Sequence, residues 1–188
     1  MVKYFEELAR LFGRIEATDF RRRNIELGGA LNGSVNLIKK TAFRGRKLLI
    51  IGNGGSASIA SHLAIDFWTN SGIKALSFYD GAQLTRLGND LGFERVFEAP
   101  VKAFSEPGDL LIAISSSGRS ENILRGVRAA RLRKCVVITL SGFRKDNPLR
   151  KTGDFNFYVP SGAYGFVETI HAAICHLIAD HTCKKRNG

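Results

Sequence analysis

The sequence contains few cysteines, and their placement does not suggest that they stabilise the fold. Among 188 residues only three are cysteine, namely Cys135, Cys175 and Cys183. Their number is odd and no two of them form a C-x-x-C pair, so we expect neither a disulfide framework nor a structural zinc knot. This usage is typical of a protein of the reducing cytoplasm.

Long apolar stretches are also missing. No apolar run approaches the roughly 20 residues that span a bilayer, and the first residues, MVKYFEE, lack the basic start and apolar run of a secretory signal. We therefore expect a soluble cytoplasmic protein with no membrane partner. Hydrophobic residues make up 44% and charged residues 24%, which excludes disordered and low-complexity classes and favours one globular domain.

Acidic residues are scarce relative to basic ones. Asp and Glu number 17 against 28 Lys and Arg, which gives a formal net charge of +11. Such a balance raises nucleic acids, anionic membranes and anionic small molecules as partners. The basic residues come in short scattered clusters without the interleaved aromatics of an RNA-binding surface. We interpret them as solvated helix faces with a general attraction for phosphates, and expect no specific nucleic-acid partner.

Five short apolar runs recur along the chain, at residues 48–51, 75–78, 110–114, 135–140 and 155–159. Continuous apolar runs bounded by Gly are typical of strands buried on both faces of a parallel sheet. Helical patterns at 56–70, 82–102 in broken form and 119–132 separate most of them, and another at 164–183 follows the last. This alternation predicts an α/β fold with a doubly wound five-stranded parallel sheet flanked by helices.

The N-terminal region has helical spacing of its apolar residues. Residues 15–40 are long enough for a single extended helix, with Gly28–Gly29 as its weak point. We expect one domain over residues 1–188, made of a long N-terminal helical arm at 1–44, an α/β core at 45–183 and a basic tail at 184–188.

Ligands of such sheets bind beyond the carboxyl ends of the strands, where two loops stand out. The first is Gly52-Asn53-Gly54-Gly55-Ser56-Ala57, a turn of low bulk that leads into a helix whose free amides favour an anion. It also fits the loose dinucleotide-binding fingerprint. A glycine-rich turn that binds nothing is the structural alternative.

The second loop, residues 115–120 (SSSGRS), offers four hydroxyl groups and a helix N-terminus. Helix capping would use one serine. The remaining hydroxyl groups suit the oxygens of a terminal phosphate, and such a loop has no place in a dinucleotide fingerprint. The two loops together therefore favour a phosphomonoester over a dinucleotide.

Ionisable residues occur on two of the predicted helices. His62 and Asp66 stand four residues apart, so that both side chains share one helix face and could converge on a metal ion or a reacting carbon. Glu168, His171 and His176 lie among apolar residues of the last helix, where an unpaired charge is costly. A surface ion pair and a satisfied core histidine are the alternative interpretations.

Four segments together resemble the SIS (sugar isomerase) domain family, and its phosphoheptose isomerase branch in particular. They are GNGGS at 52–56, GNDLGF at 88–93, ISSSG at 114–118 and VETIH at 167–171 with His176. The resemblance covers essentially the whole chain. Four positions differ from the pattern of that branch. Asp66 stands in place of Glu and Glu168 in place of Gln, and the Arg expected near Asn70 and the Asp expected near Gly165 are missing.

The resemblance implies an aldose–ketose isomerase that acts on a sugar phosphate through an enediol, most simply on sedoheptulose 7-phosphate to give D-glycero-D-heptose 7-phosphate for surface polysaccharides. It implies phosphate binding by Ser56, Ser115, Ser116, Ser117 and Ser120, contacts with sugar hydroxyls by Asn53 and Asp90, and substrate binding by Glu168. It implies zinc as cofactor, with His62, Asp66, Glu168 and His176 as ligands, and proton transfer by Asp66 and His176.

Helix geometry adds an expectation about assembly. Glu168 and His176 are eight residues apart, roughly 12 Å along a helix axis, which strains their reach to one zinc ion. We therefore expect a homo-oligomer with sites at subunit interfaces, and the resemblance implies a tetramer. A catalytically silent SIS module that binds a sugar phosphate remains the alternative, and a nicotinamide-dependent dehydrogenase is disfavoured because Asp80 comes late after the second strand.

Overall fold

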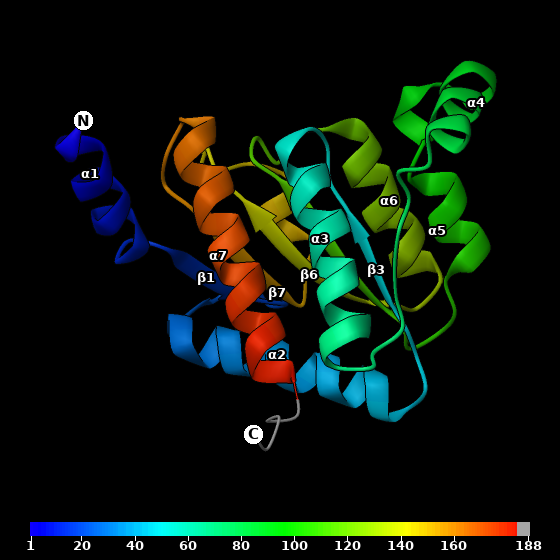
Figure 1. Cartoon of the computed structure of the whole chain (residues 1–188), viewed down its shortest axis with the longest axis horizontal. Coiled ribbons are helices and arrows are strands. Elements are labelled where there is room, and N and C mark those ends of the chain that lie inside the picture. The colour runs from blue at the N-terminus through cyan, green and yellow to red at the C-terminus, as the bar shows by residue number, and fades with distance from the viewer. Residues whose placement is uncertain (184–188) are drawn as a thin grey trace.

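The computed structural model describes residues 1–183, which form one α/β domain around a seven-stranded sheet (Figure 1). The strand order is β2-β1-β7-β6-β5-β3-β4. The expected basic tail at 184–188 lies outside the described residues. Within the described part, no helix combines the length and the apolar character needed to cross a membrane.

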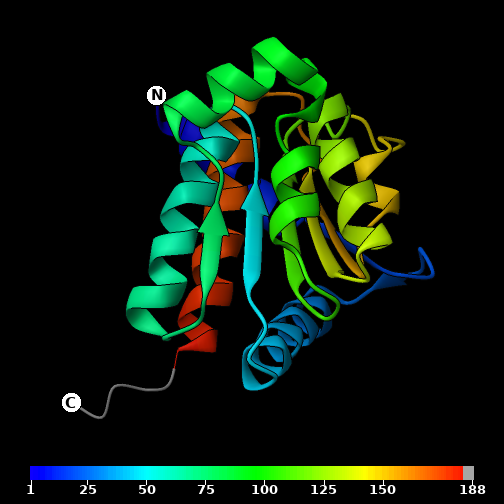
Figure 2. The ribbon, with the colours of Figure 1, turned by 90° about the vertical axis from the view of Figure 1, so that its right-hand side faces the viewer.

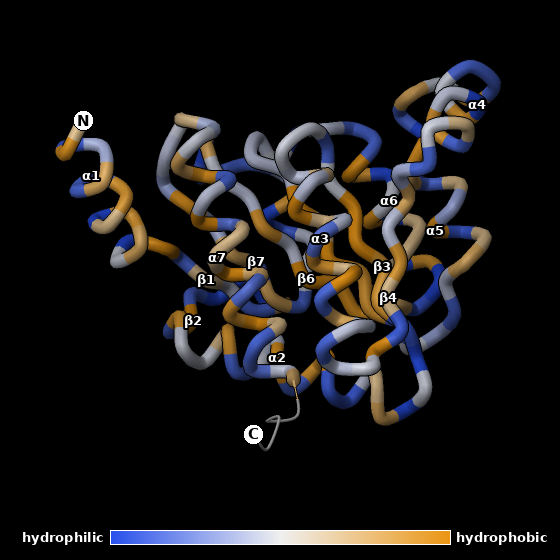
Figure 3. The backbone as a smooth tube through the Cα atoms, viewed as in Figure 1, coloured by the Kyte–Doolittle hydropathy of each residue, from blue (hydrophilic) through white to orange (hydrophobic). Residues whose placement is uncertain are grey.

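Five strands of the sheet are parallel, as predicted. They are β3 (Leu48–Ile51), β4 (Ala75–Ser77), β5 (Leu110–Ser115), β6 (Val136–Ser141) and β7 (Phe155–Tyr158). Every residue of β3 and β5 is buried, because helices cover both faces of the sheet. Figure 3 shows hydrophobic residues concentrated along these central strands.

The helices form two layers (Figure 2). On one face, α2 (Leu27–Phe43), α3 (Gly55–Asn70) and α7 (Tyr164–Thr182) share a core with the sheet that includes Ile38, Phe67 and Ile170. On the other face, α5 (Glu98–Phe104) and α6 (Glu121–Leu132) pack with Ile51 and Leu111. The helix α1 (Val2–Phe12) reaches the first of these cores only with its last turns, through Leu8 and the buried Leu11, and α4 (Gly81–Leu91) buries none of its residues. Two short 3-10 helices, η1 (Phe93–Arg95) and η2 (Leu149–Lys151), complete the elements.

The predicted single helix over residues 15–40 is wrong. Residues 16–25 instead form a hairpin of β1 (Glu16–Asp19) and β2 (Asn24–Ile25), and β1 adds to the sheet antiparallel to β7. The Asp19 carboxylate closes the turn by accepting hydrogen bonds from the amides of Arg21 and Arg23 at 2.9 and 3.0 Å. The sheet thus has two antiparallel strands beyond the five predicted.

A side-chain cap fixes the start of the helix that follows. The carboxylate of Glu26 accepts hydrogen bonds from the amides of Gly28 and Gly29 at 2.8 and 2.7 Å, which satisfies two of the free donors of the first turn of α2. The two glycines therefore lie in the first turn of α2 and do not form a weak point within a longer helix.

Candidate active site

A small polar pocket lies where the glycine loop and the serine loop meet at the carboxyl edge of the sheet. The first loop connects β3 to α3 and the second connects β5 to α6. The pocket has a volume of about 100 Å³, which suits a group as small as a phosphate. Its lining consists of Asn53, Ser56, Ser115, Ser116, Ser117, Ser120, Tyr164 and Glu168.

Hydrogen-bond donors in this pocket are left free by the protein itself. The Oγ of Ser116 is buried and has no hydrogen-bond partner among the described residues. The N-cap residues of α3 and α6 provide no side-chain cap. Gly54 has no side chain to offer and Ser120 does not cap its own helix, although in the first turn of α6 the Asn122 Oδ1 accepts from the amide of Ile123 at 2.9 Å. A buried hydroxyl group and two uncapped helix N-termini at one pocket are suited to an anion.

One pair of side chains and one side chain bonded to the backbone hold the glycine loop in place. The amide groups of Asn53 and Asn122 exchange two hydrogen bonds of 2.9 Å each, which join the glycine loop to the first turn of α6. The hydroxyl group of Tyr79 accepts from the amide of Gly52 at 2.7 Å and donates to its carbonyl at 2.9 Å. Burial raises the pKa of Tyr79, so this hydroxyl group stays protonated.

The loop after β6 supports the serine loop from behind. The amide of Gly142 donates to the carbonyl of Ser116 at 2.9 Å, and the amide of Leu149 donates to the carbonyl of Gly118 at 3.1 Å. Asn147 is fully buried and donates to three oxygen atoms of its own loop. Gly118 has φ +61°, and a Cβ there would lie 2.1 Å from the Asn147 Oδ1. The serine loop can therefore take this shape only with glycine at position 118.

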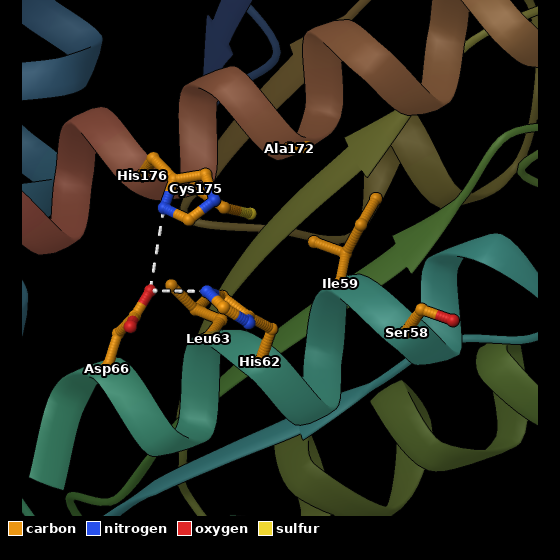
Figure 4. A pocket seen from close by; sticks show the side chains of 8 residues that line it. All are labelled: Ser58, Ile59, His62, Leu63, Asp66, Ala172, Cys175 and His176. Carbon is orange, nitrogen blue, oxygen red and sulfur yellow. Dashed lines mark ion pairs between the residues drawn. The ribbon is translucent and has the colours of Figure 1, made fainter. Parts of the chain in front are cut away.

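A second pocket, of about 300 Å³, lies between α3 and α7 (Figure 4). His62 and Asp66 come from α3, and His176 comes from α7. The Oδ2 of Asp66 lies 3.5 Å from the Nε2 of His62 and 3.5 Å from the Nδ1 of His176. The carboxylate is mostly buried while both imidazoles are about half exposed. The structure thus brings together the two predicted catalytic residues and one further predicted ligand.

These three side chains fit a divalent metal ion. One donor atom from each lies within 4.8 Å of the other two, and two imidazoles with a carboxylate are the ligand set of catalytic zinc sites that keep a fourth position open. Cys175 lines the same pocket, but its sulfur is not part of this group of donor atoms; burial raises the pKa of its thiol to about 12.

Two predicted site residues lie elsewhere. Glu168 is in the serine pocket, where its carboxylate approaches the start of α3 so closely that a Cβ on Gly55 would lie 2.3 Å from its Oε2. Asp90 lies on α4 with Arg86 in a separate hollow, at 3.4 Å from the guanidinium. A hydrogen bond from Asn89 keeps the pKa of Asp90 below its usual range. Within this chain, Asp90 does not reach the serine pocket.

The comparisons with known proteins agree with this geometry. A family model described as the SIS domain matches residues 3–142. The chain belongs to the SIS domain family. Among curated members, it is 40% identical over 141 residues to the phosphoheptose isomerase of Solidesulfovibrio magneticus, covering 72% of this chain and 68% of that protein. It is 35% identical over 189 residues to that of Thiobacillus denitrificans, covering 96% and 91%.

Solved structures of SIS proteins show the same fold. The phosphoheptose isomerase GmhA from Neisseria gonorrhoeae superposes with a TM-score of 0.83 at 28% identity, with 96% of each chain covered. A phosphoheptose isomerase from Francisella tularensis gives the same TM-score and identity, with 96% of this chain and 94% of that one covered. The predicted family is confirmed, and its relatives identify the chain as a sugar-phosphate isomerase.

Sequence reasoning missed the residues that support the SIS site. Asn122, Tyr79 and Asn147 hold the two loops, and Tyr164 lines the serine pocket. No motif or spacing marks them, because each acts on a loop from a different part of the chain. Asp80, whose late position disfavoured a nicotinamide-dependent dehydrogenase, caps α4 by accepting from the amide of Gln83 at 2.9 Å.

Proposed function

We propose that this chain is a phosphoheptose isomerase that interconverts sedoheptulose 7-phosphate and D-glycero-D-heptose 7-phosphate. The observation that carries the proposal is the buried Ser116 Oγ, which has no hydrogen-bond partner among residues 1–183 and lies in a pocket lined by four other serines. A hydroxyl group buried without a partner costs free energy unless a ligand completes it. A phosphate oxygen is the acceptor that this pocket fits.

The spacing of the two pockets along α3 suits a seven-carbon substrate. Ser56 lines the serine pocket and His62 the second pocket. Six residues of helix span about 9 Å. The eight bonds from C1 of an extended heptulose to the phosphorus span roughly 10 Å at the rise per bond of an extended chain. With its phosphate on the serines, such a sugar extends far enough for C1 and C2 to reach the His–Asp–His group.

The reaction moves one proton between carbons and one between oxygens. Asp66 is placed to take a proton from C1 of the ketose, which leaves an enediol, and to return a proton to C2. His176, 3.5 Å from that carboxylate, is placed to donate a proton to O2 while O1 loses one. The same atoms are present in substrate and product, so no oxidant or reductant is needed.

A metal ion fits this proposal. His62, Asp66 and His176 would hold zinc, which when bound polarises the carbonyl group of the sugar. Glu168 of the same chain stands with the serines, near the expected phosphate end of the sugar. In the homo-oligomer that we propose, most simply a tetramer, a Glu168 from a second copy could complete a shared zinc site. We further propose a cytoplasmic enzyme that supplies heptose for surface polysaccharides.

Product identification tests the proposed function. The purified protein is incubated with sedoheptulose 7-phosphate, with and without added zinc, and the products are followed by ¹³C NMR. We expect an aldose 7-phosphate to accumulate, and Ser116→Ala to weaken the apparent affinity for the ketose. Binding of the ketose without any turnover, at every zinc concentration, would instead support a non-catalytic sugar-phosphate-binding module.

A further inference from the structure

The basic residues that are scattered along the sequence gather at one end of the fold. Four helices, α2, α3, α5 and α6, each end just before the strand that follows them, so their C-termini share the amino edge of the sheet. Backbone hydrogen bonds join the segments that precede the strands, as from Leu48 to Lys74 at 2.8 Å and from Gly108 to Lys134 at 3.1 Å. Figure 2 shows α2 lying across this end, opposite the loops of the candidate active site.

Most of the positive charge at this end is not neutralised. Three carboxylates there are bonded to cations, namely Glu106 to Arg46, Asp109 to Lys47 and Asp154 to Arg131. Seven further basic side chains, at the ends of these helices, beside the strands and at the end of η2, are exposed and have no carboxylate within 4 Å among residues 1–183: Lys39, Lys40, Arg44, Lys74, Arg133, Lys134 and Lys151. We call these seven residues, with Phe43 and Leu132, the basic face.

Two apolar side chains project among these charges. Phe43, at the last turn of α2, is 93% exposed and follows Lys39 and Lys40 on the same helix. Leu132, at the end of α6, is 78% exposed and precedes Arg133 and Lys134. Apart from Met1 at the chain end, no other large apolar side chain of the described residues is as exposed as these two. Cations at helix C-termini are favourable on their own, but that does not account for the exposed phenyl and isobutyl groups.

We propose that the basic face docks this protein on the surface of an anionic lipid bilayer. Lysine and arginine attract acidic headgroups, and a projecting apolar side chain enters the boundary between headgroups and acyl chains. Phe43 is the one aromatic side chain of the basic face and Leu132 has no ring to stack on a base, whereas single-strand binding proteins stack successive bases on several aromatic residues, which favours lipid over nucleic acid. The sequence alone led us to expect no membrane partner, because the clusters lie far apart along the chain until the fold collects them.

Docking by this face leaves the active site open. The glycine and serine loops follow the carboxyl ends of β3 and β5, whereas the basic face lies at the amino edge of the same strands. A bound enzyme therefore presents its serine pocket to the aqueous phase. The proposal is independent of the proposed function, because vesicle binding and isomerisation use different residues.

Vesicle co-sedimentation of the full chain tests the proposal. We expect binding to phosphatidylcholine vesicles that contain phosphatidylglycerol, little binding to phosphatidylcholine alone, and release at high salt. The triple variant Lys39→Gln/Lys40→Gln/Arg44→Gln should lower the partition coefficient by about tenfold or more. The matched control Lys3→Gln/Arg14→Gln/Arg95→Gln removes the same charge away from the amino edge of the sheet and should stay within about threefold of the parent.

A separate experiment tests whether the exposed apolar side chains of the basic face contact the bilayer. Phe43→Ser should weaken vesicle binding while Phe5→Ser, at a residue 68% exposed on α1, should not. In a Trp68→Phe background, Phe43→Trp should shift its emission to the blue when anionic vesicles are added. Circular dichroism and isomerase turnover of each variant check that the fold is intact.

Several results would overturn the proposal. One is equal loss of binding in the two triple variants, which would mean that net charge alone is responsible. Another is binding of labelled duplex DNA or single-stranded RNA, lost in the first triple variant, with no binding to vesicles. A third is a changed oligomeric state of Phe43→Ser in size-exclusion chromatography, which would place this face between copies of the chain.

Discussion

The side-chain amides of Asn53 and Asn122 face each other and exchange two hydrogen bonds, although they stand 69 residues apart in the chain. One amide belongs to the glycine loop and the other to the first turn of α6, directly after the serine loop. This pair fixes the separation of the two loops that form the serine pocket.

Removing one partner of this pair should disturb both stability and binding. Asn122→Ala leaves the Asn53 amide without its partner, and we expect a loss of about 1–3 kcal/mol of unfolding free energy, with a raised KM. A double-mutant cycle with Asn53→Ala, measured by urea unfolding, isolates the coupling. Strictly additive single effects would mean that the two amides act independently.

Ser116→Ala should weaken substrate binding while leaving the free energy of unfolding almost unchanged. The variant removes a buried hydroxyl group that has no protein partner, so the free energy of unfolding should change by less than about 0.5 kcal/mol. Loss of a hydrogen bond to a charged phosphate should raise KM for the ketose phosphate by roughly 10- to 100-fold. Steady-state kinetics checks this, and an unchanged KM would place the phosphate elsewhere.

Asp66→Asn tests the centre of the His–Asp–His group. The substitution keeps the size of the side chain and removes its charge, and turnover should fall by roughly 10²- to 10⁴-fold. Metal analysis of the same sample distinguishes the roles: zinc retained makes Asp66 chiefly the base, and zinc lost makes it chiefly a ligand. Asp180→Asn, at an exposed carboxylate on the last turns of α7, is the control. Parental turnover in Asp66→Asn would remove this carboxylate from the mechanism.

Gly118→Ala should distort the serine loop. Its φ of +61° is unfavourable for alanine, and the new Cβ would collide with the Asn147 Oδ1 at 2.1 Å. We expect a loss of about 2 kcal/mol or more in unfolding free energy, together with weakened substrate binding. Gly162→Ala provides the matched control, because a Cβ there meets nothing within 4 Å. Equal stability of the two variants would contradict the tight packing behind the loop.

His171 should make the fold sensitive to mild acid. It is fully buried, its Nε2 lies 3.1 Å from the carbonyl oxygen of Ser141, and burial lowers its pKa from 6.5 to about 4. The unfolded chain therefore binds a proton that the folded state excludes. The contribution of His171 to the free energy of unfolding has its full value above pH 6.5. It falls by roughly 3 kcal/mol as the pH decreases towards 4. Urea unfolding at several pH values should show this slope reduced in His171→Gln and retained in His181→Gln.

Much of the fold could be predicted because its signals are local. Residues 48–51 are Leu-Leu-Ile-Ile, and a run of this kind between glycine-containing turns has few alternatives to a buried strand. The hairpin at 16–25 was missed for the opposite reason. Glu16–Asp19 reads EATD, which has little strand propensity, and its pairing with β7 depends on residues about 140 positions away.

The candidate site likewise contains some features that could be predicted from the sequence and others that could not. The glycine and serine loops could be predicted since each follows a strong strand signal, and the rise of a helix correctly separated Glu168 from His176. The partner of Asn53 and the support by Asn147 could not be predicted, because both depend on how loops from different βα units meet in space.

The sheet ends on very short strands, and this bears on how the protein can associate. Its outer strands are β2, with two residues, and β4, with three. Such short strands expose too few backbone N–H and C=O groups to pair continuously with a strand of another chain. They are therefore poor starting points for fibril growth at the edge of the sheet. Any assembly of this protein must therefore form through helix surfaces and loops, where single substitutions can tune or abolish it without unravelling the sheet.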